Sequence, residues 1–172
     1  MLTYMSLEGD CQAERAAKLK ALKEHFGTSD PKAFAMLEKT AMAPANKDRG
    51  DTLVINSHGN GSVFAGYKAQ AFYDQLASVG FANGSFQKIY LMACDVGEQA
   101  QDNSILNNFA KDLKRILNMH GVDVKLYAPR GTLTYMLKEE QASGQTWYQV
   151  TEMFIASPER NYPLSEGLLL VV

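Results

Sequence analysis

Cysteine is scarce in this sequence, and its scarcity argues against several classes of protein. The 172 residues include two cysteines, Cys11 and Cys94. Two cysteines do not make a disulfide framework, and neither lies at a spacing typical of metal ligands. We therefore expect no bound metal and no cofactor, and a reducing compartment is the simpler assumption.

Long apolar runs and an excess of positive charge are also missing. No stretch is long and apolar enough to cross a bilayer, and the N-terminal residues lack the pattern of a secretory signal. The formal net charge is −2, without a cluster of lysines and arginines that would suit nucleic acid. The sequence thus predicts no membrane and no nucleic-acid partner. It also predicts a cytoplasmic location, or export without a cleaved signal peptide.

The composition of the chain is that of an ordinary globular protein. Hydrophobic residues make up 46% of it and charged residues 21%, which are usual values for such proteins. A chain of this length can bury a sizeable core. We therefore expect a single domain over residues 1–172, while the oligomeric state stays open.

Strand-like and helix-like segments alternate along the chain, which indicates an α/β fold. The sequence predicts strands at residues 2–7, near Leu53 and Ile89, and at 122–127, with amphipathic helices between them. The most regular helical stripe runs from about Asp102 to Gly121. This order predicts a mostly parallel sheet of about six strands with helices on both faces. Further strand candidates are residues 132–136, 147–155 and 168–172.

Two apolar runs end in residues with reactive side chains, a histidine and a cysteine. The apolar run that begins at Leu53 ends in Ser57-His58-Gly59, with a second glycine at Gly61, and the run that begins at Ile89 ends in Ala93-Cys94. Each reads as a buried strand that delivers one reactive side chain to its carboxyl end. A helical segment between them suits a right-handed crossover, so the two strands should be neighbours. The sequence therefore predicts that His58 and Cys94 meet at the edge of the sheet where α/β proteins build sites.

This order of motifs resembles the caspase-like cysteine peptidases of clan CD. That group includes caspases, clostripain and the self-processing protease domains of bacterial toxins. In it, a histidine after one strand precedes a cysteine after the next, with similar spacing. The resemblance is local and covers about residues 53–97. It implies a three-layer α/β/α fold and a cysteine endopeptidase that acts on a peptide or protein, either self-processing or delivered by a bacterium as an effector.

The resemblance also implies roles for single residues. Cys94 would be the nucleophile that forms a thioester, and His58 would protonate the leaving amine and then activate water. The backbone N–H groups of Gly59 and Cys94 would stabilise the oxyanion. A thiol needs such a partner because it is only slightly ionised at neutral pH. Asn56 and Asp95 lie near in the chain, but the sequence gives no geometric reason to assign either as a third catalytic group.

Two further residues are candidates for substrate binding. Met92 stands two residues before Cys94, where related enzymes that cut after basic residues carry an acidic residue. Its apolar side chain favours an uncharged residue before the scissile bond over arginine or lysine. Arg130 follows the strand at 122–127 and could instead select an acidic residue, as arginine does in caspases. The sequence does not decide between these two interpretations.

The same residues allow other interpretations. A cysteine at the end of a strand is often a small buried hydrophobic residue, and Arg130 alone reads as a solvated side chain. Three classes of function therefore stay open: an endopeptidase, another thiol enzyme of acyl transfer such as an amidase or deamidase, and a catalytically inactive interaction domain of the same fold.

Overall fold

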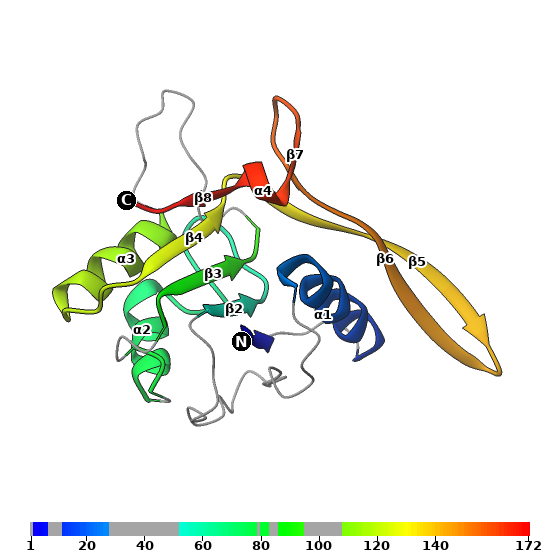
Figure 1. Ribbon diagram of the computed structural model, residues 1–172, viewed down its shortest axis with the longest axis horizontal. Helices are drawn as coiled ribbons and strands as arrows, with labels where there is room; N and C mark the ends of the chain where they lie inside the picture. Colours follow the sequence, from blue (N-terminus) through cyan, green and yellow to red (C-terminus); the bar gives the residue numbers. More distant parts are fainter. Residues whose placement is uncertain (1, 7–11, 28–51, 79, 83–85, 95–107) are drawn as a thin grey trace.

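A five-stranded sheet forms the centre of the fold (Figure 1). The structure is a computed structural model that describes residues 2–6, 12–27, 52–78, 80–82, 86–94 and 108–172. The strands lie in the order β1-β2-β3-β4-β8. Their bounds are β1 Leu2–Ser6, β2 Thr52–Asn56, β3 Lys88–Met92, β4 Lys125–Pro129 and β8 Leu168–Leu170. The first four are parallel to one another, and β8 is antiparallel to β4.

Among the strands whose burial the structure describes, β2 is the most deeply buried, because both faces of the sheet are covered at its position. All five of its residues are buried, as the near-continuous apolar runs of parallel sheets require. Leu53 and Ile55 belong to one hydrophobic core, and Val54 belongs to another. Alternate residues of one strand point to opposite faces, so the two cores lie on opposite sides of the sheet.

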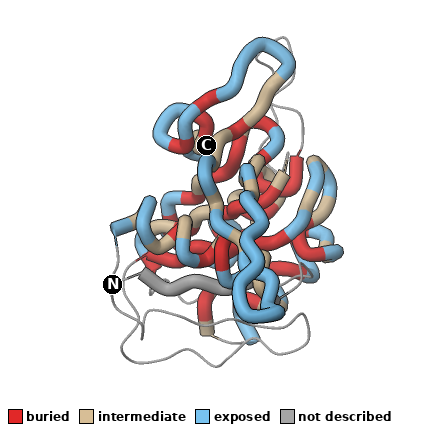
Figure 2. Tube along the Cα trace, turned by 90° about the vertical axis from the view of Figure 1, so that its right-hand side faces the viewer, coloured by how far each residue is buried: buried red, intermediate tan, exposed pale blue. Residues whose placement is uncertain are grey.

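Three helices cover these two faces. Helices α2 (Ala69–Ser78) and α3 (Phe109–Met119) contact each other and contribute Phe72, Leu76 and Leu113 to the core around Leu53. Helix α1 (Gln12–Phe26) contributes Leu19 and Leu22 to the core around Val54. In Figure 2 the buried stretches, in red, lie mostly towards the centre of the molecule. The α/β class predicted from the sequence is confirmed.

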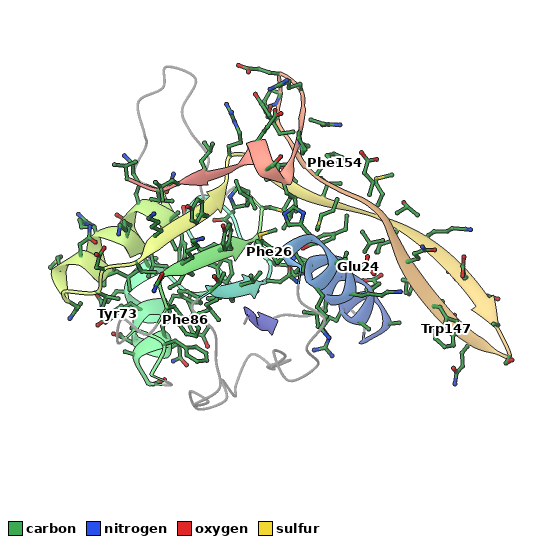
Figure 3. All side chains as sticks on the ribbon, in the orientation of Figure 1. Glu24, Phe26, Tyr73, Phe86, Trp147 and Phe154 are labelled. Carbon is green, nitrogen blue, oxygen red and sulfur yellow. The ribbon has the colours of Figure 1, made fainter. Side chains whose placement is uncertain are left out.

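The chain after β4 forms a second sheet, with strand order β5-β6-β7. These strands are antiparallel and span Thr132–Ala142, Gln145–Ala156 and Asn161–Pro163. A short helix, α4 (Leu164–Gly167), then leads into β8. In Figure 1 the hairpin of β5 and β6 extends from the main sheet as a long arm. Figure 3 shows Trp147 near its far end, where this residue is 56% exposed.

This second sheet corrects the prediction of about six mostly parallel strands in one sheet. A parallel neighbour needs a crossover of about a dozen residues, usually a helix. Only Arg130 and Gly131 separate β4 from β5, so β5 cannot return to lie parallel in the main sheet. It pairs instead with β6 through a two-residue turn, in which Ser143 and Gly144 have φ of 53° and 76°. Positive φ at both central residues is the type I′ geometry of tight hairpins.

Helix α3 begins later than predicted. Its N-cap, Asn108, is extended, with φ −111° and ψ 170°, and its Oδ1 accepts a hydrogen bond from the Lys111 N–H. The helix therefore starts at Phe109, because an extended residue cannot belong to a continuous helix. The predicted start near Asp102 lies outside the described residues.

Candidate active site

The carboxyl ends of β2 and β3 bring His58 and Cys94 to the same edge of the sheet. The two strands are parallel and in register, with Asn56 opposite Met92. One more hydrogen bond extends this pairing, because the Ser57 N–H donates to the Met92 carbonyl oxygen at 3.1 Å. The chain then leaves the sheet at nearly the same level in both strands. His58 and Cys94 line one small cavity of about 60 Å³.

A tight loop fixes the backbone around His58. The His58 carbonyl accepts a hydrogen bond from the Ala65 N–H at 2.8 Å. Asn60 Oδ1 accepts from the N–H groups of Ser62 and Val63, at 2.8 and 3.1 Å. These bonds tie the loop to itself, and the His58 side chain is exposed at the cavity. The hydrogen bonds of the loop therefore fix the backbone that carries the His58 imidazole ring.

Gly59, the residue after the histidine, is half-buried within this loop. It pairs with Phe64 in an isolated bridge, but the bonds of that bridge are made by the neighbouring residues. Within the described part of the chain, the structure gives the Gly59 N–H no hydrogen-bond acceptor. A backbone N–H in that state is available to an external acceptor.

Cys94 is half-buried, and its thiol faces strand β5. Its Sγ donates to the Leu133 carbonyl oxygen at 3.5 Å. A thiol is a weak donor, so this bond holds the side chain without locking it. Strand β5, from the second sheet, therefore forms one wall of the cavity, and the position of that strand affects the nucleophile directly.

Sequence reasoning missed most of the remaining wall. The residues that line the cavity are Lys18, Asn56, Ser57, His58, Ala93, Cys94, Leu133 and Tyr135. The Tyr135 hydroxyl donates to Asn56 Oδ1 at 2.8 Å, and Lys18 Nζ lies 5.2 Å from the centre of the Tyr135 ring. Lys18 comes from α1 and Tyr135 from β5. No local pattern marks these two residues, because their place depends on how α1 and the hairpin pack.

The structure does not place Met92 or Arg130 at the cavity. Met92 is fully buried, in the core that contains Val54 and Leu22, because the last residue of β3 still lies within the covered sheet. Arg130 stacks on Tyr162, with 4.2 Å between its guanidinium carbon and the ring centre. Its backbone N–H donates to the Gly167 carbonyl. Both residues thus serve packing in this structure.

Among the residues that the structure describes, no group of three histidine, cysteine, aspartate or glutamate side chains could hold a metal ion. In the same part of the chain, none of the helices has both the length and the hydropathy needed to span a membrane.

The fold and the site define an α/β protein with a thiol and an imidazole at the carboxyl ends of two adjacent parallel strands. No model of a known protein family matches the sequence, and no curated protein is significantly similar to it.

Proposed function

We propose that this protein is a cysteine endopeptidase that uses His58 and Cys94 to hydrolyse peptide bonds through a thioester. The observation that carries the proposal is the shared cavity at the ends of β2 and β3, which both residues line. A nucleophile and a base delivered by separate rigid strands are the minimal parts of thiol acyl transfer. A caspase-like α/β/α arrangement is part of this proposal.

The first half of the reaction forms the acyl-enzyme. The proton of Cys94 passes to His58, and the thiolate attacks the carbonyl carbon of the scissile peptide bond. The carbonyl electron pair moves to oxygen, where the N–H groups of Gly59 and Cys94 stabilise the charge. The carbon–nitrogen bond then breaks, the amine leaves with the proton from His58, and a thioester remains. The thiol must first turn from the Leu133 carbonyl oxygen towards His58.

The second half of the reaction restores the enzyme. His58 takes a proton from water, and the resulting hydroxide attacks the thioester carbonyl carbon. The carbon–sulfur bond breaks, the carboxylic acid product leaves, and the proton on His58 returns to Cys94. Backbone donors placed at the developing oxyanion contribute roughly 3–4 kcal/mol each in comparable sites. Gly59 suits that role because its N–H has no acceptor within the described residues.

Digestion of a peptide library tests the proposal. We expect the wild-type protein to create new peptide termini, Cys94→Ala to create none, and His58→Ala to be slower by a factor on the order of a hundred. Cys11→Ala is the matched thiol control and should keep full activity. Mass spectrometry of the products gives the cleavage rates.

Three outcomes would contradict the proposal. Equal cleavage by Cys94→Ala would exclude Cys94 as the nucleophile. Conversion of side-chain amides to acids without new termini would indicate an amidase or deamidase. No change to any peptide would favour an inactive interaction domain.

A further inference from the structure

One contact of the Cys94 thiol comes from the second sheet. Its Sγ donates to the Leu133 carbonyl oxygen at 3.5 Å, and Leu133 lies near the start of β5. A carbonyl oxygen accepts the proton of a thiol but has nothing to donate to a thiolate. The contact therefore stabilises the thiol relative to the thiolate, which is the reactive form.

Tyr135 ties the same part of β5 to the main sheet. Its hydroxyl donates to Asn56 Oδ1, on β2, at 2.8 Å. Asn56 is 6% exposed and Tyr135 is half-buried, and a hydrogen bond in such surroundings is stronger than one in water. Tyr135 and Leu133 are two residues apart on one strand, so their side chains lie on the same face. Both pack in the core that contains Val54.

This hydrogen bond lies at the boundary between the packed and the exposed part of the hairpin. The register of β5 and β6 shifts between Met136 and Leu137, directly after Tyr135. Such a bulge bends a strand and interrupts its ladder. Beyond it, residues 138–142 are all exposed, and Figure 1 shows this part of the hairpin as an extended arm. Tyr135 therefore ties β5 to the main sheet just where the strand leaves the body of the protein.

A tie between β5 and β2 also fixes β5 relative to the nucleophile. Strands β2 and β3 are paired in register, with Asn56 opposite Met92, and Cys94 follows two residues after Met92. Apolar packing of Leu133 is non-directional, whereas a hydrogen bond depends steeply on its geometry. A small shift of β5 is therefore enough to remove the contact between the Leu133 carbonyl oxygen and the thiol.

We propose that the hydrogen bond from Tyr135 to Asn56 holds the Leu133 carbonyl oxygen against Cys94 and thereby keeps the thiol protonated until β5 moves. Tyr135 is a positioning residue in this inference, because it acts on the nucleophile through β5. The inference rests on the proposed role of Cys94 and adds how the reactivity of that thiol is set. A shift of β5 that separates Tyr135 from Asn56 frees the thiol to transfer its proton to His58.

The pH dependence of Cys94 alkylation tests this inference without any turnover. Iodoethane has no charge and no oxygen group, and its reaction with the thiolate forms a carbon–sulfur bond and releases iodide. Peptide mapping by mass spectrometry follows Cys94 separately from Cys11. The midpoint of the rate against pH reports the ionisation of the thiol, whereas the plateau at high pH reports the access of the reagent.

We expect Tyr135→Phe, which removes only the hydroxyl oxygen, to lower the midpoint by about half a pH unit and to raise the rate at pH 7 about threefold, as loss of one modest hydrogen bond does. The plateau at high pH should stay unchanged. Asn56→Leu removes the acceptor of the same bond and should lower the midpoint equally. The double variant should lower it no further, because both substitutions remove one interaction.

A matched control separates this effect from the loss of any tyrosine hydroxyl. Tyr127→Phe removes a phenol oxygen of β4, outside the cavity. Neither its midpoint nor its plateau should differ from those of the wild-type protein. Circular dichroism establishes that each variant is folded. If Asn56→Leu does not fold, Tyr135→Phe carries the test, since it removes a single oxygen atom.

Three results would overturn the inference. An unchanged or higher midpoint in Tyr135→Phe would show that the hydroxyl does not hold the carbonyl against the thiol. A raised plateau without a lower midpoint would show only looser packing around Cys94. Midpoint shifts that add in the double variant would show that Tyr135 and Asn56 act independently. Failure of the peptide digest would instead overturn the proposed endopeptidase and leave the measured midpoints standing.

Discussion

Two neighbouring residues at the end of β2 carry polar side chains with different surroundings. Asn56 is bound by Tyr135, whereas the hydroxyl of Ser57 is buried and has no hydrogen-bond partner in the described structure. The backbone N–H of Ser57 is hydrogen-bonded, since it continues the pairing of β2 with β3. The buried hydroxyl therefore lowers the stability of the fold, because no hydrogen bond compensates for its loss of contact with water.

Removing that hydroxyl should stabilise the protein. We expect Ser57→Ala to raise the free energy of unfolding by about 1 kcal/mol, because a buried hydroxyl without a partner carries a desolvation penalty. Urea denaturation of the two proteins gives the difference. A lower stability of Ser57→Ala, or a fall in the alkylation rate of Cys94, would show that the hydroxyl has a partner of its own in or near the site.

Sequence reasoning found His58 and Cys94 because each follows an apolar run, and the ends of adjacent parallel strands must meet. It could not find Lys18 or Tyr135, whose neighbours in the chain carry no sign of a site. Asn56 lies two residues before His58 in the sequence, but its hydrogen bond from the Tyr135 hydroxyl, 79 positions away, forms only in the folded chain. The sequence also points to Met92 as a substrate-binding residue, but its side chain is buried in the core.

At the scale of the elements, the hairpin of β5 and β6 connects the site to the rest of the fold. Helix α1 packs against β6, and Leu19 and Leu22 of α1 share a core with Leu133 and Ile155 of the hairpin. Leu133 is also the residue whose carbonyl oxygen binds Cys94. A substitution at the base of the hairpin should therefore change the reactivity of the Cys94 thiol.

Gly131 lies at that base, and the space around it requires glycine. A Cβ atom there would overlap the carbonyl oxygen of Ala156, which belongs to the backbone of β6. We expect Gly131→Ala to lower the free energy of unfolding by about 2 kcal/mol, as overpacking against atoms that cannot yield does. It should also change the alkylation rate of Cys94 severalfold, because Leu133 follows two residues later. Thermal unfolding and labelling with iodoacetamide measure the two effects.

Gly144 provides a control at the other end of the same hairpin. It has a positive φ of 76°, and nothing lies within 4 Å of a Cβ built there. Gly144→Ala should strain the turn but leave the alkylation rate of Cys94 unchanged. Equal effects of both substitutions on Cys94 would contradict the role assigned to the hairpin base.

On the scale of the whole molecule, the sequence predicted the α/β class but not the division into two sheets. The apolar runs of β2 and β3 are visible in the sequence because all of β2 and most of β3 are buried. The hairpin is not visible as a separate sheet, because β5 and β6 are exposed over most of their distal residues and lack a regular apolar pattern. The short link at Arg130 and Gly131, rather than any strand propensity, decides where these strands pair.

His58 and Cys94 are proposed to act as a pair, and the pH dependence of Cys94 labelling tests this pairing most directly. A free thiol ionises near pH 8.5. The labelling rate of Cys94 with iodoethane, which carries no oxygen group, is to be measured from pH 5 to pH 10 in the wild-type protein and in His58→Ala. We predict that the wild-type thiol already reacts below pH 7, and that in His58→Ala the rate rises only near the value of a free thiol. Identical profiles for the two proteins would contradict the account, because the histidine would then have no influence on the thiol beside it.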